Sequence, residues 1–175
     1  MTSSRIIDQH NTGLNRPKEM VTSIIDPDTL ASPLAQTYLY WQKIQASRTL
    51  PLASDFDPIA IPQALAHLIL VGIEQSPLDF RFRVIGDYIN ERMKTNYMHQ
   101  CLSDIPEKGP SSQIWAFYER CWSEKKPVLV RLNYIGPYAG IRQSEEIYLP
   151  LGNEAGEVTK ILVCLTFDAQ GIPPR

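Results

Sequence analysis

The chain has 175 residues, a length that suits one domain with a single hydrophobic core. Its composition, 43% hydrophobic and 21% charged, is that of a globular protein, and a formal net charge of -2 gives no basic field for nucleic acid. No run approaches the roughly 18 apolar residues of a membrane-spanning helix, and the first residues lack the apolar core of a signal peptide. These features predict a cytoplasmic protein with neither nucleic acid nor membrane as a partner.

The first part of the chain divides into an arm and a helix. Residues 1–27 mix polar residues and proline without a sustained period, which predicts a flexible arm. Residues 28–50 are predicted to contain an amphipathic helix, and Pro33 is tolerated only in its first turn, so the regular part should begin near Ser32. Its apolar residues recur every three or four positions: Leu30, Leu34, Tyr38, Trp41 and Ile44.

The middle of the chain predicts a hairpin. Residues 51–66 carry prolines and turn-forming residues and should form an ordered loop with a short helical turn. Residues 67–75 are apolar and β-branched, and residues 80–86 alternate with a period of two, so the two runs predict an antiparallel hairpin. After Gly86, Ile89 and Met93 are four apart, which predicts a short helix that begins near Asp87.

The second half begins with the strongest helix signal. Residues 110–127 place Ile114, Phe117, Tyr118, Cys121 and Trp122 on one helical face, with Ser111 or Ser112 as the cap. Strand patterns follow at 128–136, 145–152 and 158–167. We therefore predict an α+β fold: a five-stranded antiparallel sheet with helices on one face and an N-terminal amphipathic helix. The domain should span 51–170, followed by a tail at 171–175.

This order, with three particular stretches of sequence, resembles the PAS domain. The stretches are "YWQKIQASRTLPLASDFDP", "LAHLILVGIE" and "DFRFRVIGDYINERM", and the resemblance runs from about Tyr40 to Asp168. It is closest in kind to a bacterial family of stand-alone PAS-like proteins. The resemblance implies a sensory module for signal transduction, with an interior that can hold a small ligand. One departure is "KTNYMHQCL", which lacks the glycines that PAS domains usually carry after the short helix.

The resemblance leaves the cofactor unknown. Flavin-binding photosensors of this superfamily carry an asparagine-cysteine-arginine run on the pocket helix, and "HQCLSD" does not provide it. Haem would need an axial ligand, for which only His67 and His99 are available within the domain. Because His67 begins an apolar strand, a hydrogen bond to the backbone explains it better than a metal.

No catalytic residue and no metal site are predicted. His99, Cys101 and Asp104 are close in sequence, but nothing near them would activate the thiol, and no second ligand pair follows. Cys101, Cys121 and Cys164 are odd in number and far apart, so we expect small buried hydrophobes and no disulfides.

The interior is open to two interpretations, a packed core or a pocket for a small molecule. The candidate lining residues share the predicted inner face of the sheet or the helices above it. They are Phe80, Phe82, Val84, Ile89, Met93, Trp115, Tyr118, Val130, Leu132, Ile147 and Leu149.

The opposite face should carry charges and a contact surface. Alternation places Arg81, Arg83, Arg131, Glu146 and Tyr148 there, with the arginines paired to Glu74 or Glu146. Leu129 and Leu162 share this face and need a cover, which the N-terminal helix could supply in its own chain or in a partner's. The candidate contact surface is Leu34, Tyr38, Trp41, Ile44, Leu129 and Leu162.

We expect a homodimer or an unidentified protein partner, because no output domain fits into the rest of the chain and a signal would have to pass through contacts. The alternative is a small α+β cavity enzyme of the isomerase or hydratase type. That alternative needs a carboxylate or histidine inside the cavity, and alternation predicts none from the strands, with Glu146 outward and Glu145 at a strand edge. Asp87 or His99 in a solvent-linked pocket would favour it.

Overall fold

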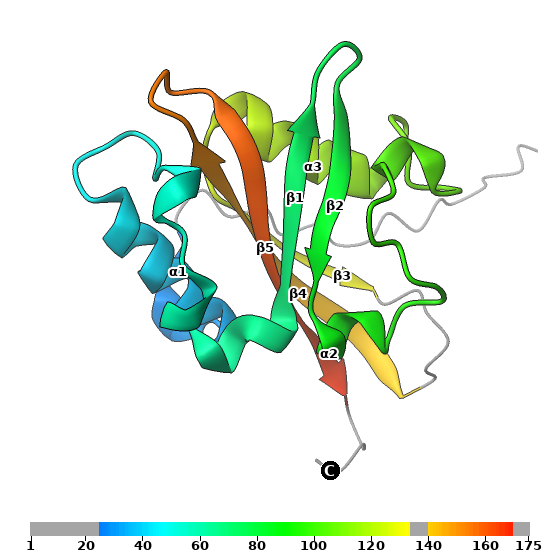
Figure 1. Ribbon diagram of the computed structural model, residues 1–175. Helices are drawn as coiled ribbons and strands as arrows, with labels where there is room; N and C mark the ends of the chain where they lie inside the picture. The colour runs from blue at the N-terminus through cyan, green and yellow to red at the C-terminus, as the bar shows by residue number, and fades with distance from the viewer. Residues whose placement is uncertain (1–24, 134–139, 170–175) are drawn as a thin grey trace, which may run out of the picture.

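The computed structural model describes residues 25–133 and 140–169 (Figure 1). Most of the predicted arm and the whole predicted tail lie outside these ranges. Three α-helices are present in the described part: α1 (Ser32–Gln45), α2 (Asp87–Asn90) and α3 (Gln113–Glu124). Short 3-10 turns occupy Pro27–Thr29, Ala53–Asp55, Pro58–Ala60, Pro62–His67 and Leu102–Asp104. No helix in the described ranges is long and apolar enough to cross a bilayer.

The five strands form one antiparallel sheet in the order β2-β1-β5-β4-β3. They are β1 (Leu68–Glu74), β2 (Asp79–Ile85), β3 (Val128–Asn133), β4 (Ile141–Gly152) and β5 (Val158–Ala169). The predicted α+β fold and its five strands are confirmed. β4 begins before the predicted residue 145, and residues 134–136, predicted to extend β3, lie outside the described ranges.

The two long helices begin as the sequence predicts. Pro33 lies in the first turn of α1, which starts at Ser32. Ser112 caps α3 by accepting a hydrogen bond from the Trp115 backbone N–H at 3.1 Å. α3 ends at Glu124, and the next residue, Lys125, adopts a left-handed conformation with φ 55°.

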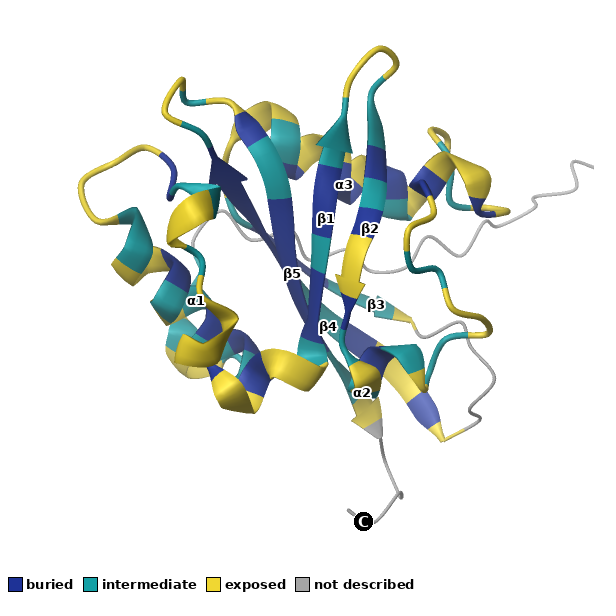
Figure 2. Ribbon diagram, viewed as in Figure 1, coloured by how far each residue is buried: buried dark blue, intermediate teal, exposed yellow. Residues whose placement is uncertain are grey.

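Helices cover both faces of the sheet, and α1 and α3 lie on opposite sides (Figures 1 and 2). We call the face under α3 the inner face and the face under α1 the outer face. The inner cluster contains Phe80, Trp115 and Tyr118, and the outer cluster contains Leu34 and Trp41 of α1. Each face therefore has its own hydrophobic core, and the central strands are buried on both sides (Figure 2).

In β4, the residues predicted to face the interior lie on the outer face, and those predicted to face outward lie on the inner face. Ile147, Leu149 and Leu151 belong to the outer cluster, whereas Tyr148 belongs to the inner cluster. A strand buried on both faces shows no apolar-polar contrast, so the aliphatic residues alone could not indicate which side faces α3.

The prediction for Val84 was also wrong, because an irregularity shifts the register between β1 and β2. Val71 pairs with Phe82 but Leu70 pairs with Val84, which leaves Arg83 as an extra residue in β2. Val84 therefore lies opposite Leu70 of the outer cluster and is 49% exposed.

Gly86 joins β2 to α2 at a position with no room for a side chain. A Cβ atom there would lie 2.3 Å from the Ala66 carbonyl oxygen and 2.7 Å from that of Leu65. Gly86→Ala is therefore expected to lower the free energy of unfolding by about 1–3 kcal/mol, because backbone must move to relieve the overlap. Urea denaturation would measure the loss. The control is Gly109→Ala, whose Cβ would meet nothing closer than 3.9 Å; equal losses in the two variants would contradict the close approach at Gly86.

Candidate functional site

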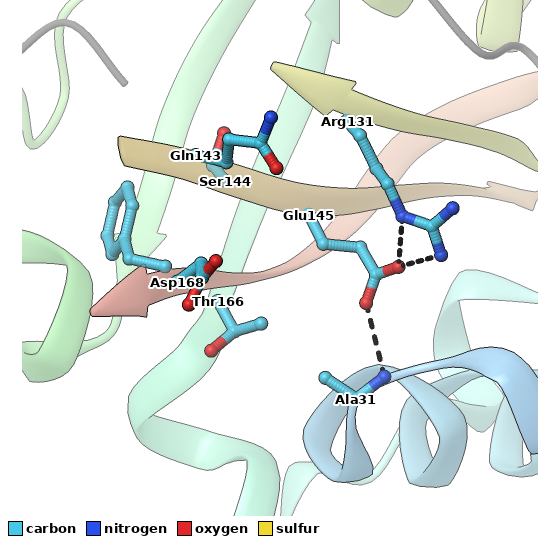
Figure 3. A pocket seen from close by; sticks show the side chains of 8 residues that line it. Ala31, Arg131, Gln143, Ser144, Glu145, Thr166 and Asp168 are labelled. Atoms are coloured by element: carbon cyan, nitrogen blue, oxygen red, sulfur yellow. Dashed lines mark hydrogen bonds and ion pairs between the residues drawn. The ribbon is translucent and has the colours of Figure 1, made fainter. Parts of the chain in front are cut away.

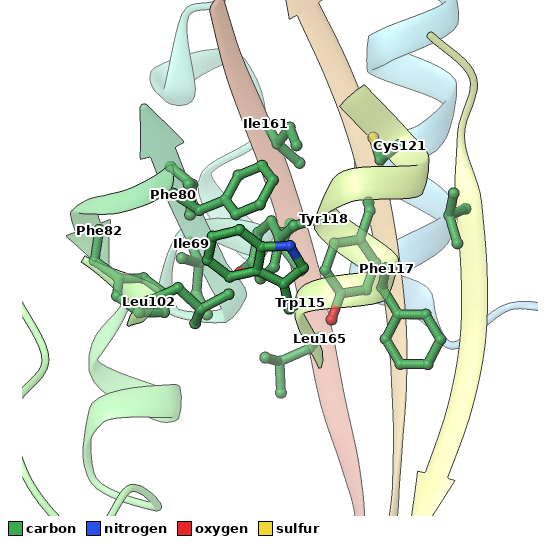
Figure 4. Packing of buried hydrophobic residues seen from close by; sticks show 14 of the residues in the cluster. Ile69, Phe80, Phe82, Leu102, Trp115, Phe117, Tyr118, Cys121, Ile161 and Leu165 are labelled. Carbon is green, nitrogen blue, oxygen red and sulfur yellow. The ribbon is translucent and has the colours of Figure 1, made fainter. Parts of the chain in front are cut away.

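Aromatic rings fill the space between the inner face and α3 (Figure 4). The Phe80 ring centroid lies 4.9 Å from that of Trp115 and 5.3 Å from that of Tyr118. Tyr118 in turn meets Tyr148 edge to face at 4.9 Å. Rings at these separations are in van der Waals contact, so no ligand lies between them.

The candidate lining residues divide into three groups in the structure. Two, Met93 and Leu132, are partly buried at the margin of the inner cluster. Three face elsewhere: Val84 is exposed, and Ile147 and Leu149 lie in the outer cluster. The rest are buried in the inner cluster: Phe80, Phe82, Ile89, Trp115, Tyr118 and Val130.

Glu146 faces the inner cluster, contrary to the prediction that it points outward. Its carboxylate accepts hydrogen bonds from the Ser144 hydroxyl at 2.7 Å and from the Tyr148 hydroxyl at 2.6 Å. Burial raises the pKa of Tyr148 well above its usual value, and the Glu146 charge raises it further. Burial and the same charge also raise the pKa of Tyr118. We call Ser144, Glu146 and Tyr148 the inner polar cluster.

The charge of the inner polar cluster also acts on Lys108. Its pKa is lowered, mainly by burial, while the negative charge of Glu146 opposes that shift. The sequence held one signal for this arrangement, because Glu145 and Glu146 are adjacent in a strand and must point to opposite faces. One of the two carboxylates therefore had to lie inward.

His67 and Tyr88 form hydrogen bonds with the backbone of β5 near its C-terminal end. The Nδ1 atom of His67 lies 3.1 Å from the carbonyl oxygen of Leu165, and its ring packs against that of Tyr88 at a tilt of 34°, with the centroids 4.0 Å apart. The Tyr88 hydroxyl accepts a hydrogen bond from the backbone N–H of Phe167 at 3.3 Å. The Arg92 guanidinium lies over the Tyr88 ring at 3.8 Å. The backbone contact predicted for His67 is present.

The environment of His67 predicts a loss of stability in acid. Burial lowers its pKa below the usual 6.5, and the charge of Arg92 lowers it further, although the Leu165 carbonyl opposes both. The unfolded chain therefore takes up the proton first, so stability falls as the pH drops below about 6.5 and levels off below the folded pKa. Urea denaturation between pH 8 and about pH 5 should show a smaller loss in His67→Asn, which does not titrate. Identical pH profiles would contradict this role.

The thiols do not resemble nucleophiles. All three cysteines are buried and unpaired. Burial raises the pKa of Cys101 and Cys121, and it raises that of Cys164 to about 12. Cys101 pairs with Arg81 in an isolated β-bridge, so it serves the edge of the sheet. Among the described residues, no three His, Cys, Asp or Glu side chains gather as metal ligands.

The predicted contact surface is covered by the chain itself. Leu34 and Trp41 of α1 are buried against Leu129 and Leu162, and Tyr38 and Ile44 pack at their margin. The Trp41 indole Nε1 donates a hydrogen bond to the Pro150 carbonyl oxygen at 2.8 Å. Leu34, Trp41, Leu129 and Leu162 are therefore core residues of the outer cluster and cannot lie on a dimer surface. Of the two predicted covers for Leu129 and Leu162, the structure shows the helix of the same chain.

A groove of about 380 Å³ lies on the outer face beside the start of α1 (Figure 3). Arg131 donates to Glu145 from Nε at 2.8 Å and from Nη2 at 2.6 Å, and the other Glu145 oxygen accepts the Ala31 backbone N–H at 3.1 Å. Since Ala31 has no side chain that could cap α1, Glu145 caps the helix from the sheet. The groove is lined by Ala31, Arg131, Gln143, Ser144, Glu145, Thr166, Phe167 and Asp168.

The arginines of the outer face are paired. Glu74 accepts from Arg81 at 2.7 Å and from Arg83 at 2.9 Å, as predicted. Arg131 binds Glu145 instead of the predicted Glu146, because Glu146 faces the other side. The two pairs of Glu74 are partly exposed, so each is worth no more than about 1 kcal/mol.

A hairpin, a helical crossover and a three-stranded meander in the order 2-1-5-4-3 make the α+β fold that the resemblance to the PAS domain implies. The family model of the PAS domain matches residues 29–166. This range is most of the chain, so the chain belongs to the PAS domain family. Neither the curated proteins nor the solved structures contain a match to this chain.

Proposed function

We propose that this PAS domain is a non-catalytic module for sensing or protein interaction, which acts through contacts with a second copy or with a protein partner. The observation that supports it is the packed interior, where the rings of Phe80, Trp115 and Tyr118 are in contact. An enzyme of this size would need a substrate cavity, and here that volume holds side chains. Signals would then pass through the surface of the domain, in the cytoplasm of a bacterial cell.

Two measurements test this proposal. Sedimentation across a wide concentration range should show self-association, and an absorbance spectrum with native mass spectrometry should show no retained chromophore or metabolite. A monomer at every concentration would contradict the dimeric form of the proposal. A stoichiometric small molecule would instead make the interior a ligand site.

A second candidate, a small cavity enzyme of the isomerase or hydratase type, is favoured by one observation. Glu146 places a carboxylate on the inner face with Ser144 and Tyr148 as hydrogen-bond donors. An NMR screen with small hydroxylated carbonyl compounds would test it. Shifts at the inner polar cluster that disappear in Glu146→Gln would support a site there, and a lack of shifts in the wild type would count against it.

A further inference from the structure

The groove on the outer face lies where β4 and β5 run past the start of α1. The two strands pair antiparallel there, with Glu145 opposite Thr166. Two residues further along, Gln143 lies opposite Asp168. Residues two apart in a strand share a face, and so do residues directly opposite each other, so all four side chains lie on the outer face. Figure 3 shows them in the groove beside Ala31, the N-cap of α1.

Asp168 differs from the other carboxylates that the strands carry on the outer face. Glu74, Asp79 and Glu145 each accept hydrogen bonds from other side chains. In the part of the chain that the structure describes, the Asp168 side chain has neither a hydrogen bond nor an ion pair. Glu145 and Arg131 compensate each other, so the uncompensated charge of the groove is that of Asp168.

Two neutral groups beside Asp168 are also without partners. Neither the Gln143 amide nor the Thr166 hydroxyl makes a hydrogen bond among the described residues. Each of these groups can both donate and accept a hydrogen bond. The wall opposite them is fixed, because the Glu145 side chain is only 14% exposed and is held by Arg131. A concave site with a fixed wall and a few unpaired polar groups is typical of small-ligand binding.

We propose that this groove binds a small primary amine that also carries hydroxyl or amide groups, with its ammonium group at Asp168. The ammonium donates to the Asp168 carboxylate, and the hydroxyl or amide groups of the ligand bond to Gln143 and Thr166. A volume of about 380 Å³ is small for a ligand pocket and suits a molecule the size of a monosaccharide or a dipeptide.

This inference rests on the proposed function, because it names a signal that the module detects outside its packed interior. Ala31 also lines the groove, so a bound ligand lies against the cap of the helix that covers the outer face. One charged contact in an open groove gives weak binding, and the ligand exchanges quickly. A purified protein without a retained metabolite therefore agrees with this site.

The same groups disfavour an anion or a metal ion. Arg131 is the cation of the groove, and Glu145 already binds it, so an anion would meet the uncompensated charge of Asp168. A divalent cation such as Ca²⁺ needs several oxygen ligands, including carboxylates. Among the described residues, no three His, Cys, Asp or Glu side chains gather to supply them.

An NMR titration of the full chain with two matched pairs of probes tests the proposal. Glucosamine and glucose differ in one ammonium group, and so do glycylglycinamide and N-acetylglycinamide. At about pH 6.5, where the amines are protonated, at least one amine should shift the backbone amides of residues 143–145 and 166–168. Its neutral partner should bind about fivefold more weakly or worse.

Asp168→Asn keeps the size of the side chain and removes its charge. Because Asp168 is exposed and has no partner among the described residues, the variant should be as stable as the wild type. It should bind the amine no better than the neutral partner. The matched control is Glu154→Gln, exposed in the turn between β4 and β5 at the other end of these strands, which should bind the amine like the wild type.

Three results would overturn the site: no shifts in the groove with either amine, equal binding of an amine and its neutral partner, or unchanged binding of the amine in Asp168→Asn. A protein that self-associates but binds neither amine would overturn the groove and leave the proposed function intact. A protein that binds an amine at Asp168 and stays monomeric would support the groove and contradict only the dimeric form of the proposed function.

Discussion

Trp41→Ala should lower the free energy of unfolding by about 3–5 kcal/mol, the usual cost of truncating a buried tryptophan. Trp41 is 4% exposed and packs in the outer cluster, and its indole binds the Pro150 carbonyl oxygen in a buried setting. The alanine variant would lose the apolar contacts and leave that carbonyl without its donor. Guanidinium denaturation followed by circular dichroism would measure the loss.

The hydrogen bond and the packing can be separated. Pro150 lies beyond Tyr148, the last residue of β4 that pairs with β3, so no residue of β3 donates to its carbonyl oxygen and the Trp41 indole does so instead. Pro150 itself has no N–H to donate at this position. Trp41→Phe keeps most of the apolar contact and removes the donor, with an expected loss of about 1–3 kcal/mol. Leu39→Ala is the control, because Leu39 is 52% exposed on the same helix and should change stability by less than about 0.5 kcal/mol. Equal effects of Trp41→Ala and Leu39→Ala would contradict the docking of α1 on the sheet.

Local signals explain how much of the fold was predictable from sequence. Pro33 and Ser112 mark the starts of α1 and α3, because each acts within one helical turn. The alternation of Phe80 and Phe82 correctly indicated the inner face, because β2 is an edge strand with one face exposed to solvent. Local chemistry and a one-sided period were sufficient in these cases.

The candidate site was less predictable because it depends on two-sided burial. Ile147 and Leu149 were assigned to the wrong face, and the assignment of Glu146 was reversed with them. Nothing local to β4 shows that α1 covers the outer face, since that cover comes from more than 100 residues earlier in the chain. The bulge at Arg83 is similar, because alternation continues through it in the sequence but not in the ladder.

A residue of the neighbouring strand changes the interpretation of the arginines of β2. A run of alternating aromatic and basic residues could mark a surface for anions, but Glu74 on the neighbouring strand binds both Arg81 and Arg83. The aromatic half of the run fills the inner core. The strand thus separates a packed interior from a paired charged surface.

Phe80→Ala should also lower the free energy of unfolding by about 3–5 kcal/mol, and it tests whether the interior is packed or hollow. Phe80 is 1% exposed and contacts both Trp115 and Tyr118. If the interior is packed, truncation of Phe80 leaves a void that the neighbouring rings fill only in part. In a domain that already had an open pocket, the same truncation would cost less, because fewer contacts would be lost. Chemical denaturation would measure the difference from Val84→Ala, a control at an exposed position of the same strand.

The void itself can be detected with an apolar probe. An apolar cavity the size of an aromatic side chain stays dry and binds small aromatic molecules, so benzene should raise the melting temperature of Phe80→Ala. It should leave the wild type unchanged, because the rings of Phe80, Trp115 and Tyr118 already occupy that volume. A comparable rise in the wild type would mean that the inner face holds a pocket before any mutation. The interior would then be a ligand site, and the packed core would no longer support the proposed function.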